Sequence, residues 1–188
     1  GAQAYADAVA VYLGFVVDRG ADFNNSVCRW SPSNEKIMNL FGRQAIPMVW
    51  DFAEANIIAN TVGGWITCCD YIASCIETIL VKAKQVEHYG HVYHADAAKL
   101  KLDIDNILVS TDPPYYDNIG YADLSDFFYI WIRRSIKEIY PGLLSTIVTP
   151  KTQELVATPY RFNGDTQKAK EHFEDGFRNA FSNLKEKL

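Results

Sequence analysis

The fold of this chain of 188 residues is decided by one stretch, Asn106-Ile107-Leu108-Val109-Ser110-Thr111-Asp112-Pro113-Pro114-Tyr115. Residues 106–110 form an apolar, β-branched run of strand length, and such a run is typical of a parallel strand buried on both faces. Pro113 and Pro114 donate no backbone N–H to a ladder, so the chain must leave the sheet there. The stretch therefore predicts a buried strand that ends in a stiff polar loop.

Helical periodicity surrounds this strand. Apolar residues recur at three- and four-residue steps over four stretches, which predicts four helices: residues 2–18, 66–83, 123–139 and 165–187. Asp165 is placed to cap the last helix, a short helix is expected over Ile37–Phe41, and an alternating run predicts a strand at 91–94. Residues 143–164 are rich in turn formers and predict a long loop.

The order of these elements indicates α/β architecture: strand, tight loop, helix, long loop, helix. We expect residues 1–90 to form a mainly helical segment and residues 91–188 to form part of an α/β domain. Ligands of such sheets bind in the crevice at the carboxyl ends of the strands. The loop at residues 111–122 lies at that end, so it is the first place to look for a site.

Composition limits the classes of protein. The chain carries 18 basic and 23 acidic residues, a net charge of −5. A freestanding DNA-binding domain is usually basic, because phosphate contacts supply most of its non-specific affinity. The net negative charge therefore argues against this chain binding DNA by itself. No apolar run approaches the roughly 18–20 residues that cross a bilayer, and no signal-peptide pattern opens the chain, so we expect no membrane partner.

The metal-binding residue types show no metal-binding pattern. Four cysteines are present without a Cys-x-x-Cys pair, and reduced cysteines with no signal fit the cytoplasm. His88, His91 and His94 recur every third residue, but on a strand His91 and His94 point to opposite faces. We therefore expect no metal site and a cytoplasmic location.

The two ends of the chain indicate a fragment. The chain begins at Gly1 without an initiator Met, and it stops at Lys185–Leu188, which are predicted to form the last turn of a helix. We expect both ends to be cuts in a longer polypeptide.

The loop at Asp112–Tyr115 has the groups needed to hold an amino group attached to an aromatic ring. The lone pair of such an amine is delocalised, so it is a poor nucleophile, and two acceptors aimed at its hydrogens favour a tetrahedral nitrogen. The Asp112 side chain and the Pro113 carbonyl are such a pair, and preorganised acceptors cost no rearrangement in the transition state. Tyr115 offers a face on which a base extruded from a duplex can stack, worth roughly 1–3 kcal/mol. The alternative is an ordinary Asp-Pro-Pro turn.

A longer match supports the chemical interpretation. Residues Ser110–Asn118 resemble the catalytic motif of amino-methyltransferases, and Tyr121–Tyr129 resembles one group of them, the large adenine-specific DNA methylases. Three further stretches are similar to that group: Phe41–Gln44, Trp50–Asn56 and Phe173–Gly176. The resemblance covers most of the chain.

The resemblance implies a partial Rossmann-like methyltransferase fold with added helices, the cofactor S-adenosylmethionine, and DNA as substrate and partner. It assigns catalytic roles to the DPPY motif, which consists of Asp112, Pro113, Pro114 and Tyr115. The implied cofactor-binding residues are Asp96, Ala97 and Asp112. The implied substrate-binding residues are Tyr115, Tyr116, Asp117 and Tyr121. For Asp96 the alternative is an aspartate that caps a helix or a turn.

The chain departs from the family pattern in one respect. Such enzymes hold the methyl donor with a glycine-rich loop, Phe-x-Gly-x-Gly, after the first strand, and this chain has none; Gly63 and Gly64 do not follow a strand. We therefore expect half of the cofactor site to lie in a missing upstream part of the same polypeptide, and the fragment alone to be inactive. The alternatives are an RNA or protein-glutamine amino-methyltransferase and a non-catalytic nucleic-acid-binding module. Asp112 favours DNA, because the RNA and protein relatives more often carry Asn at this position.

Two groups of residues are weaker candidates. Arg133, Arg134 and Lys137 can contact phosphates, or they form a solvated helix face. Trp50, Asp51, Glu54 and Asn56 can line the pocket of the whole enzyme, or Trp50 and Phe52 pack the start of a helix.

Overall fold

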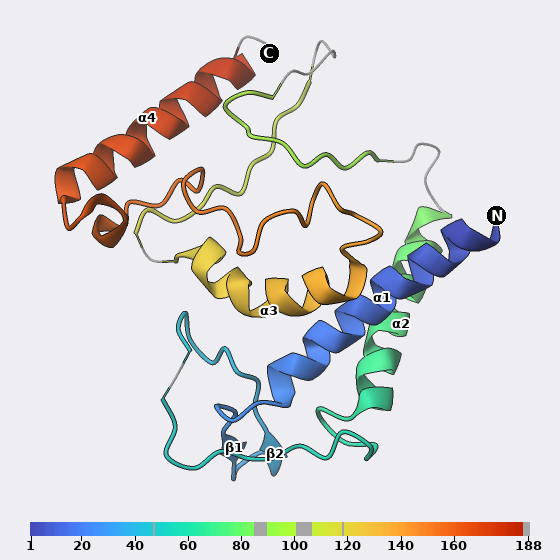
Figure 1. Cartoon of the computed structure of the whole chain (residues 1–188). Coiled ribbons are helices and arrows are strands. Elements are labelled where there is room, and N and C mark those ends of the chain that lie inside the picture. Colours follow the sequence, from blue (N-terminus) through green and yellow to red (C-terminus); the bar gives the residue numbers. More distant parts are fainter. Residues whose placement is uncertain (47, 85–89, 101–106, 118, 186–188) are drawn as a thin grey trace. The chain divides into compact units, whose positions relative to one another are not determined.

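The computed structural model describes residues 1–46, 48–84, 90–100, 107–117 and 119–185 (Figure 1). Helices make up 47% of the described chain. Its strands are limited to a two-stranded antiparallel ribbon of β1 (Trp30–Ser31) and β2 (Lys36–Ile37), in which Trp30 pairs with Ile37.

The predicted α/β class, a partial Rossmann-like sheet with added helices, is wrong, because the described residues contain no sheet of several strands. Residues 91–94 and 107–110 have neither ladder partners nor regular structure, and Asn106 lies outside the described residues. Leu108 is 97% exposed, so the apolar run is not buried on both faces. A strand takes its backbone partners from other strands, and no neighbouring strand in the described part of the chain supplies them.

The chain divides into two compact units. The first unit consists of residues 1–89 and 123–149, and the second consists of residues 90–122 and 150–188. Residues 123–149 therefore group with the N-terminal helices and not with the segment that precedes them.

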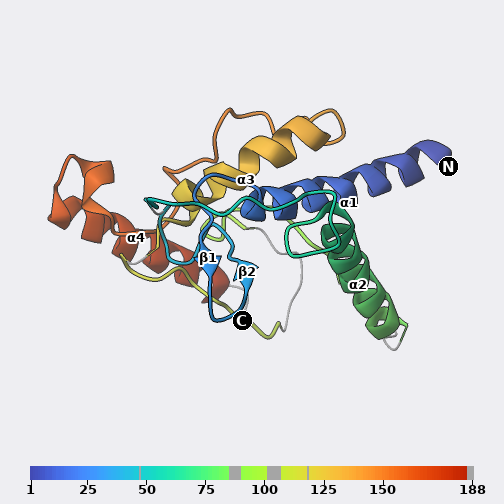
Figure 2. The ribbon, with the colours of Figure 1, turned by 90° about the horizontal axis from the view of Figure 1, so that it is seen from below.

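The first unit is built on two long helices, α1 (Ala2–Phe23) and α2 (Trp65–Ala83), which pack against each other (Figure 1 and Figure 2). The helices predicted at 2–18 and 66–83 are confirmed, and α1 continues past its predicted end. The apolar periodicity that predicted them is a local property of the sequence, and helix packing makes use of it.

Asn24 ends α1 and joins it to the turn that precedes α2. Its backbone N–H and its side-chain Nδ2 donate to the Gly20 carbonyl oxygen (2.9 and 2.8 Å), and Nδ2 also donates to the Gly63 carbonyl oxygen (2.9 Å). Gly63 has a φ of +82°, a conformation that favours glycine. A Cβ on Gly64 would lie 1.9 Å from the Ala59 oxygen. These two glycines therefore serve the turn that leads into α2.

The helix α3 (Tyr121–Ile136) confirms the helix predicted at 123–139, and its residues from Asp123 onward belong to the first unit. Its Ile132 and Ile136 side chains lie against Gly14 of α1, where an added Cβ would meet both at 3.4 Å. A glycine at this position lets the two helices approach closely.

Cys28, Ile37 and Leu40 form a cluster of buried apolar side chains in the first unit. The Leu40 N–H donates to the backbone oxygen and to the Oδ1 of Asp22, at 2.9 and 3.1 Å. The short helix predicted over Ile37–Phe41 is therefore wrong: Ile37 belongs to β2, and the Leu40 amide finds its acceptors on α1 instead of within a helix.

The second unit contains a short 3-10 helix, η1 (Pro159–Phe162), and the long helix α4 (Thr166–Lys185), which pack against each other. The loop predicted at 143–164 is confirmed except for η1. The helix predicted at 165–187 is confirmed up to Lys185, and residues 186–188 lie outside the described residues.

The start and the inner face of α4 follow from its sequence. Asp165 Oδ1 accepts the backbone N–H groups of Gln167 and Lys168, both at 3.0 Å, which confirms the predicted cap. The Phe173 and Phe177 rings stack along the helix with centroids 4.6 Å apart.

Asp18 is a half-buried carboxyl on α1. Its Oδ1 atom is inaccessible to solvent and has no hydrogen-bond partner among the described residues. Burial raises the pKa of this carboxyl from 3.8 to about 7, because the charged form loses its hydration. Asp18 therefore makes the stability of the first unit depend on pH.

We expect Asp18→Asn to stabilise the protein at about pH 8 and to have a smaller effect near pH 4. A raised folded-state pKa contributes stability that is present below 3.8 and is lost as the pH rises through about 7. Asparagine carries no charge over this range, so it escapes that loss. Thermal unfolding of both proteins at the two pH values measures the effect. Asp70→Asn, at an exposed position on α2, is the control, and its effect should not change with pH. A variant at position 18 that is no more stable than the parent at about pH 8 would contradict the expectation.

Candidate functional site

The DPPY motif lies in the second unit, in a segment without helix or strand. The side chains of Asp112, Pro113 and Tyr115 are exposed, Tyr115 at 56%, and Pro114 is half-buried. The carboxylate and the phenol ring assigned to the reaction are thus open to solvent.

Tyr116, the next residue, is held in place on both its ring and its backbone. Its ring meets the Phe173 ring of α4 edge-on, with centroids 5.0 Å apart and an interplanar angle of 81°. Its carbonyl oxygen accepts the N–H of Ala157 at 2.7 Å. The structure therefore places Tyr116, predicted to bind substrate, in a packing contact that anchors the end of the motif.

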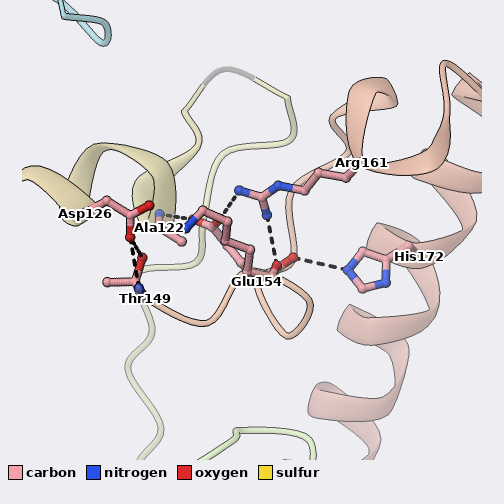
Figure 3. Close-up of polar contacts among 7 residues, drawn as sticks. Ala122, Asp126, Thr149, Glu154, Arg161 and His172 are labelled. Carbon is pink, nitrogen blue, oxygen red and sulfur yellow. Dashed lines mark hydrogen bonds and ion pairs between the residues drawn. The ribbon is translucent and has the colours of Figure 1, made fainter. Parts of the chain in front are cut away.

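Figure 3 shows a polar cluster that includes the residue following Tyr121. Glu154 Oε1 accepts the backbone N–H of Ala122 at 3.0 Å, and Glu154 Oε2 lies 2.7 Å from Arg161 Nη2. Arg161 Nη1 donates to the Lys151 carbonyl oxygen at 3.0 Å, and His172 Nε2 lies 3.1 Å from the Glu154 carbonyl oxygen. The Glu154 and Arg161 side chains are only 13% and 12% exposed. Burial of two charges is tolerated here because they pair with each other.

No sequence pattern predicts this cluster. Glu154 and Arg161 lie in a predicted loop, and His172 lies on α4, so only the folded chain brings them together. One signal points to it: the apolar run Leu155–Ala157 interrupts a loop that is otherwise polar, and Val156 and Ala157 are buried.

The remaining predicted substrate-binding residues fall at the two ends of the segment from 116 to 122. Asp117 is exposed, and Tyr121 is the first residue of α3. Residues 154–157 hold Tyr116 and Ala122. Asp112 and Tyr115 are not among the residues that 154–157 hold.

Asp96 and Ala97, predicted to bind the cofactor, form a capped turn. Asp96 Oδ1 accepts the Ala98 N–H at 2.9 Å, and Asp96 Oδ2 lies 3.3 Å from Lys99 Nζ. The hydrogen bond from Ala98 and then the one from Lys99 lower the pKa of this carboxyl. The Ala97 carbonyl oxygen accepts a hydrogen bond from Asn183 Nδ2 on α4 at 3.0 Å.

These residues do not form a site for S-adenosylmethionine by themselves. Both carboxylate oxygens of Asp96 are used within its own turn, and Ala97 and Asp112 are exposed rather than enclosed.

Two of the pockets lined by described residues lie within the first unit. One, of about 310 Å³, lies between residues 24–26 and 52–55 and is lined in part by Glu54; the other, of about 170 Å³, is lined in part by Arg29 and Arg43. Trp50 is almost fully exposed, so it does not pack the start of a helix.

The polar residues of α3 hold the loop that follows it. Asp126 Oδ1 accepts hydrogen bonds from the backbone N–H (2.9 Å) and the hydroxyl of Thr149 (Figure 3). Arg133 Nε donates to the Leu144 carbonyl oxygen at 3.2 Å. Arg134 is exposed. Arg133 therefore has a structural contact, whereas the Arg134 side chain is exposed to solvent.

The described residues contain no group of three or more His, Cys, Asp or Glu side chains that could hold a metal ion. His88 lies outside them. Within the same part of the chain, no helix combines the length and the apolar character that a bilayer span requires.

Comparison with known proteins gives no relative: the chain matches no protein-family model, no curated protein and no solved structure.

The two adjacent tyrosines should differ in their effect on stability. We expect Tyr116→Ala to lower the free energy of unfolding by about 1–2 kcal/mol, because it removes an edge-on aromatic pair and the buried part of the ring. Tyr115→Ala, at the more exposed position, is the matched control and should change it by less than about 0.5 kcal/mol. Urea unfolding of the two variants measures the difference. Equal losses at both positions would show that Tyr116 is not an anchor.

Proposed function

We propose that this chain carries the amine-binding loop of an S-adenosylmethionine-dependent methyltransferase that acts on adenine in DNA. The observation that supports the proposal best is the DPPY motif at Asp112–Tyr115, extended by Tyr121–Tyr129 in the sequence. In this proposal the protein works in the cytoplasm, where free thiols stay reduced.

In the proposed chemistry, two hydrogen-bond acceptors bind the amine and one aromatic ring stacks on the base. Asp112 and the Pro113 carbonyl accept the two hydrogens of the exocyclic amine and orient its nitrogen toward the methyl donor. Pro113 and Pro114 have fixed φ angles, which stiffens the backbone that carries this carbonyl. Tyr115 stacks on the base after it leaves the duplex, a contact worth roughly 1–3 kcal/mol.

The contacts of the two tyrosines support this proposal. Both side chains are exposed, Tyr115 at 56% and Tyr116 at 44%. Tyr116 packs against Phe173 and its carbonyl oxygen accepts the Ala157 N–H, and in this proposal the Tyr115 ring receives the base.

The methyl donor requires residues other than those described. The sequence has no glycine-rich donor loop, and Asp96 is engaged in its own turn. We therefore propose that an upstream segment of the same polypeptide completes the donor site and that the net charge of −5 is offset elsewhere where DNA binds.

We expect Asp112→Ala in the protein encoded by the whole gene to abolish methyl transfer to DNA, because one of the two amine acceptors is lost. Asp112→Asn keeps an acceptor oxygen and should retain part of the activity. Asp70→Ala, at an exposed position on α2, is the control and should be fully active. Transfer of labelled methyl groups to adenine-containing duplexes measures all four proteins.

Full activity of Asp112→Ala would refute the proposed role. Methylation of RNA or of a protein glutamine in place of DNA would move the chemistry to another substrate. No methylation by the unaltered protein would favour a non-catalytic binding module.

A further inference from the structure

We propose that Glu154 is a positioning residue for the chain that follows the DPPY motif: its carboxylate holds Ala122, while Ala157 of the same short segment holds Tyr116. Its consequence for catalysis rests on the function proposed above. The holding of the loop itself rests on contacts within the second unit alone.

The first hold is at Tyr116. Its carbonyl oxygen receives the N–H of Ala157 at 2.7 Å, and its ring rests on Phe173. Val156 and Ala157 are buried, so the donor of this hydrogen bond belongs to the interior of the unit. The residue that directly follows the DPPY motif is thus fixed to a rigid support.

The second hold is at Ala122, where the loop passes into a helix. The first N–H groups of a helix have no partner within it and need acceptors from elsewhere. Glu154 Oε1 accepts the Ala122 N–H at 3.0 Å. A carboxylate at this position also interacts favourably with the positive end of the helix dipole. Glu154 therefore acts as a cap supplied by a distant part of the sequence.

Glu154 can hold Ala122 because the carboxylate is itself immobilised. Its second oxygen pairs with Arg161 at 2.7 Å, and Arg161 is tied to the Lys151 carbonyl oxygen at 3.0 Å. The backbone oxygen of Glu154 lies 3.1 Å from His172 Nε2 on α4. Figure 3 shows these contacts converging on Glu154. The ion pair with Arg161 of η1 thus orients the carboxylate, and His172 of α4 contacts the backbone of the same residue.

The spacing of the two holds matters for the motif. Glu154 holds Ala122 and Ala157 holds Tyr116, so the short segment 154–157 carries both contacts. A displacement of about 1 Å at reacting groups can cost roughly a hundredfold in rate. Glu154 touches neither base nor cofactor in this account, and it acts only through Tyr116 and Ala122.

Residue-resolved amide hydrogen exchange tests the hold. We expect Glu154→Ala to raise the exchange rate of the Ala122 amide about tenfold, the effect of losing one hydrogen bond to a charged acceptor. Glu154→Gln keeps an oxygen for Ala122 but loses the charge and should give a smaller rise. Glu171→Ala, at an exposed position on α4, is the matched control and should change nothing. The amide of Ala169, buried in the first turn of α4, reports whether the unit as a whole has loosened.

Unchanged exchange at Ala122 in a folded Glu154→Ala protein would overturn the proposal. Should that variant fail to fold, unchanged exchange in Glu154→Gln would overturn it.

The catalytic consequence has a separate measurement on the protein encoded by the whole gene. We expect Glu154→Ala to lower kcat about 10- to 100-fold with little change in KM for DNA, because the loop is misplaced while phosphate contacts remain. Glu154→Gln should restore most of the rate. Loss of Ala122 protection with an unchanged kcat would refute the positioning role. Absence of methylation by the unaltered protein would refute the proposed function instead and leave the exchange result valid.

Discussion

The ion pair between Glu154 and Arg161 is the interaction on which the arrangement of the candidate site depends. Both side chains are nearly buried, and each would be costly to bury alone. Their pairing fixes a carboxylate in one orientation, and that carboxylate closes the start of α3 at Ala122. A contact of this kind contributes little net stability compared with an apolar pair of the same size. The ion pair instead helps to define one position for the chain at Ala122, which follows the DPPY motif.

Tyr115, the last residue of the motif, and Tyr116, which follows it, differ in their contacts. The Tyr116 ring packs edge-on against Phe173 and its carbonyl oxygen accepts the Ala157 N–H, although the side chain is still 44% exposed. Tyr115 has most of its surface open to solvent. A loop that presents groups to a flat ligand without moving needs one residue that anchors it and a neighbouring residue that stays exposed.

The helices could be predicted from the sequence because their signals are local. Apolar periodicity predicted α1, α2, α3 and α4, and Asp165 was identifiable as a cap from its place at the start of a periodic stretch. The strand predicted at 106–110 was wrong because a β-branched run specifies a strand only when other strands supply its partners. The same limit applies to the site: Asp112 and Tyr115 could be singled out from a contiguous motif. Glu154 could not, because it meets Ala122 only through the fold.

In the function proposed above, the Asp112–Tyr115 loop binds adenine in DNA for methylation. The most direct test is base-resolved mapping of methylated adenine in DNA from cells with the gene, without it, and with the gene restored. We expect methylation of the adenine amino group at a defined set of sites to disappear when the gene is deleted and to return when the gene is restored. An unchanged pattern of adenine methylation in the deletion strain would contradict it.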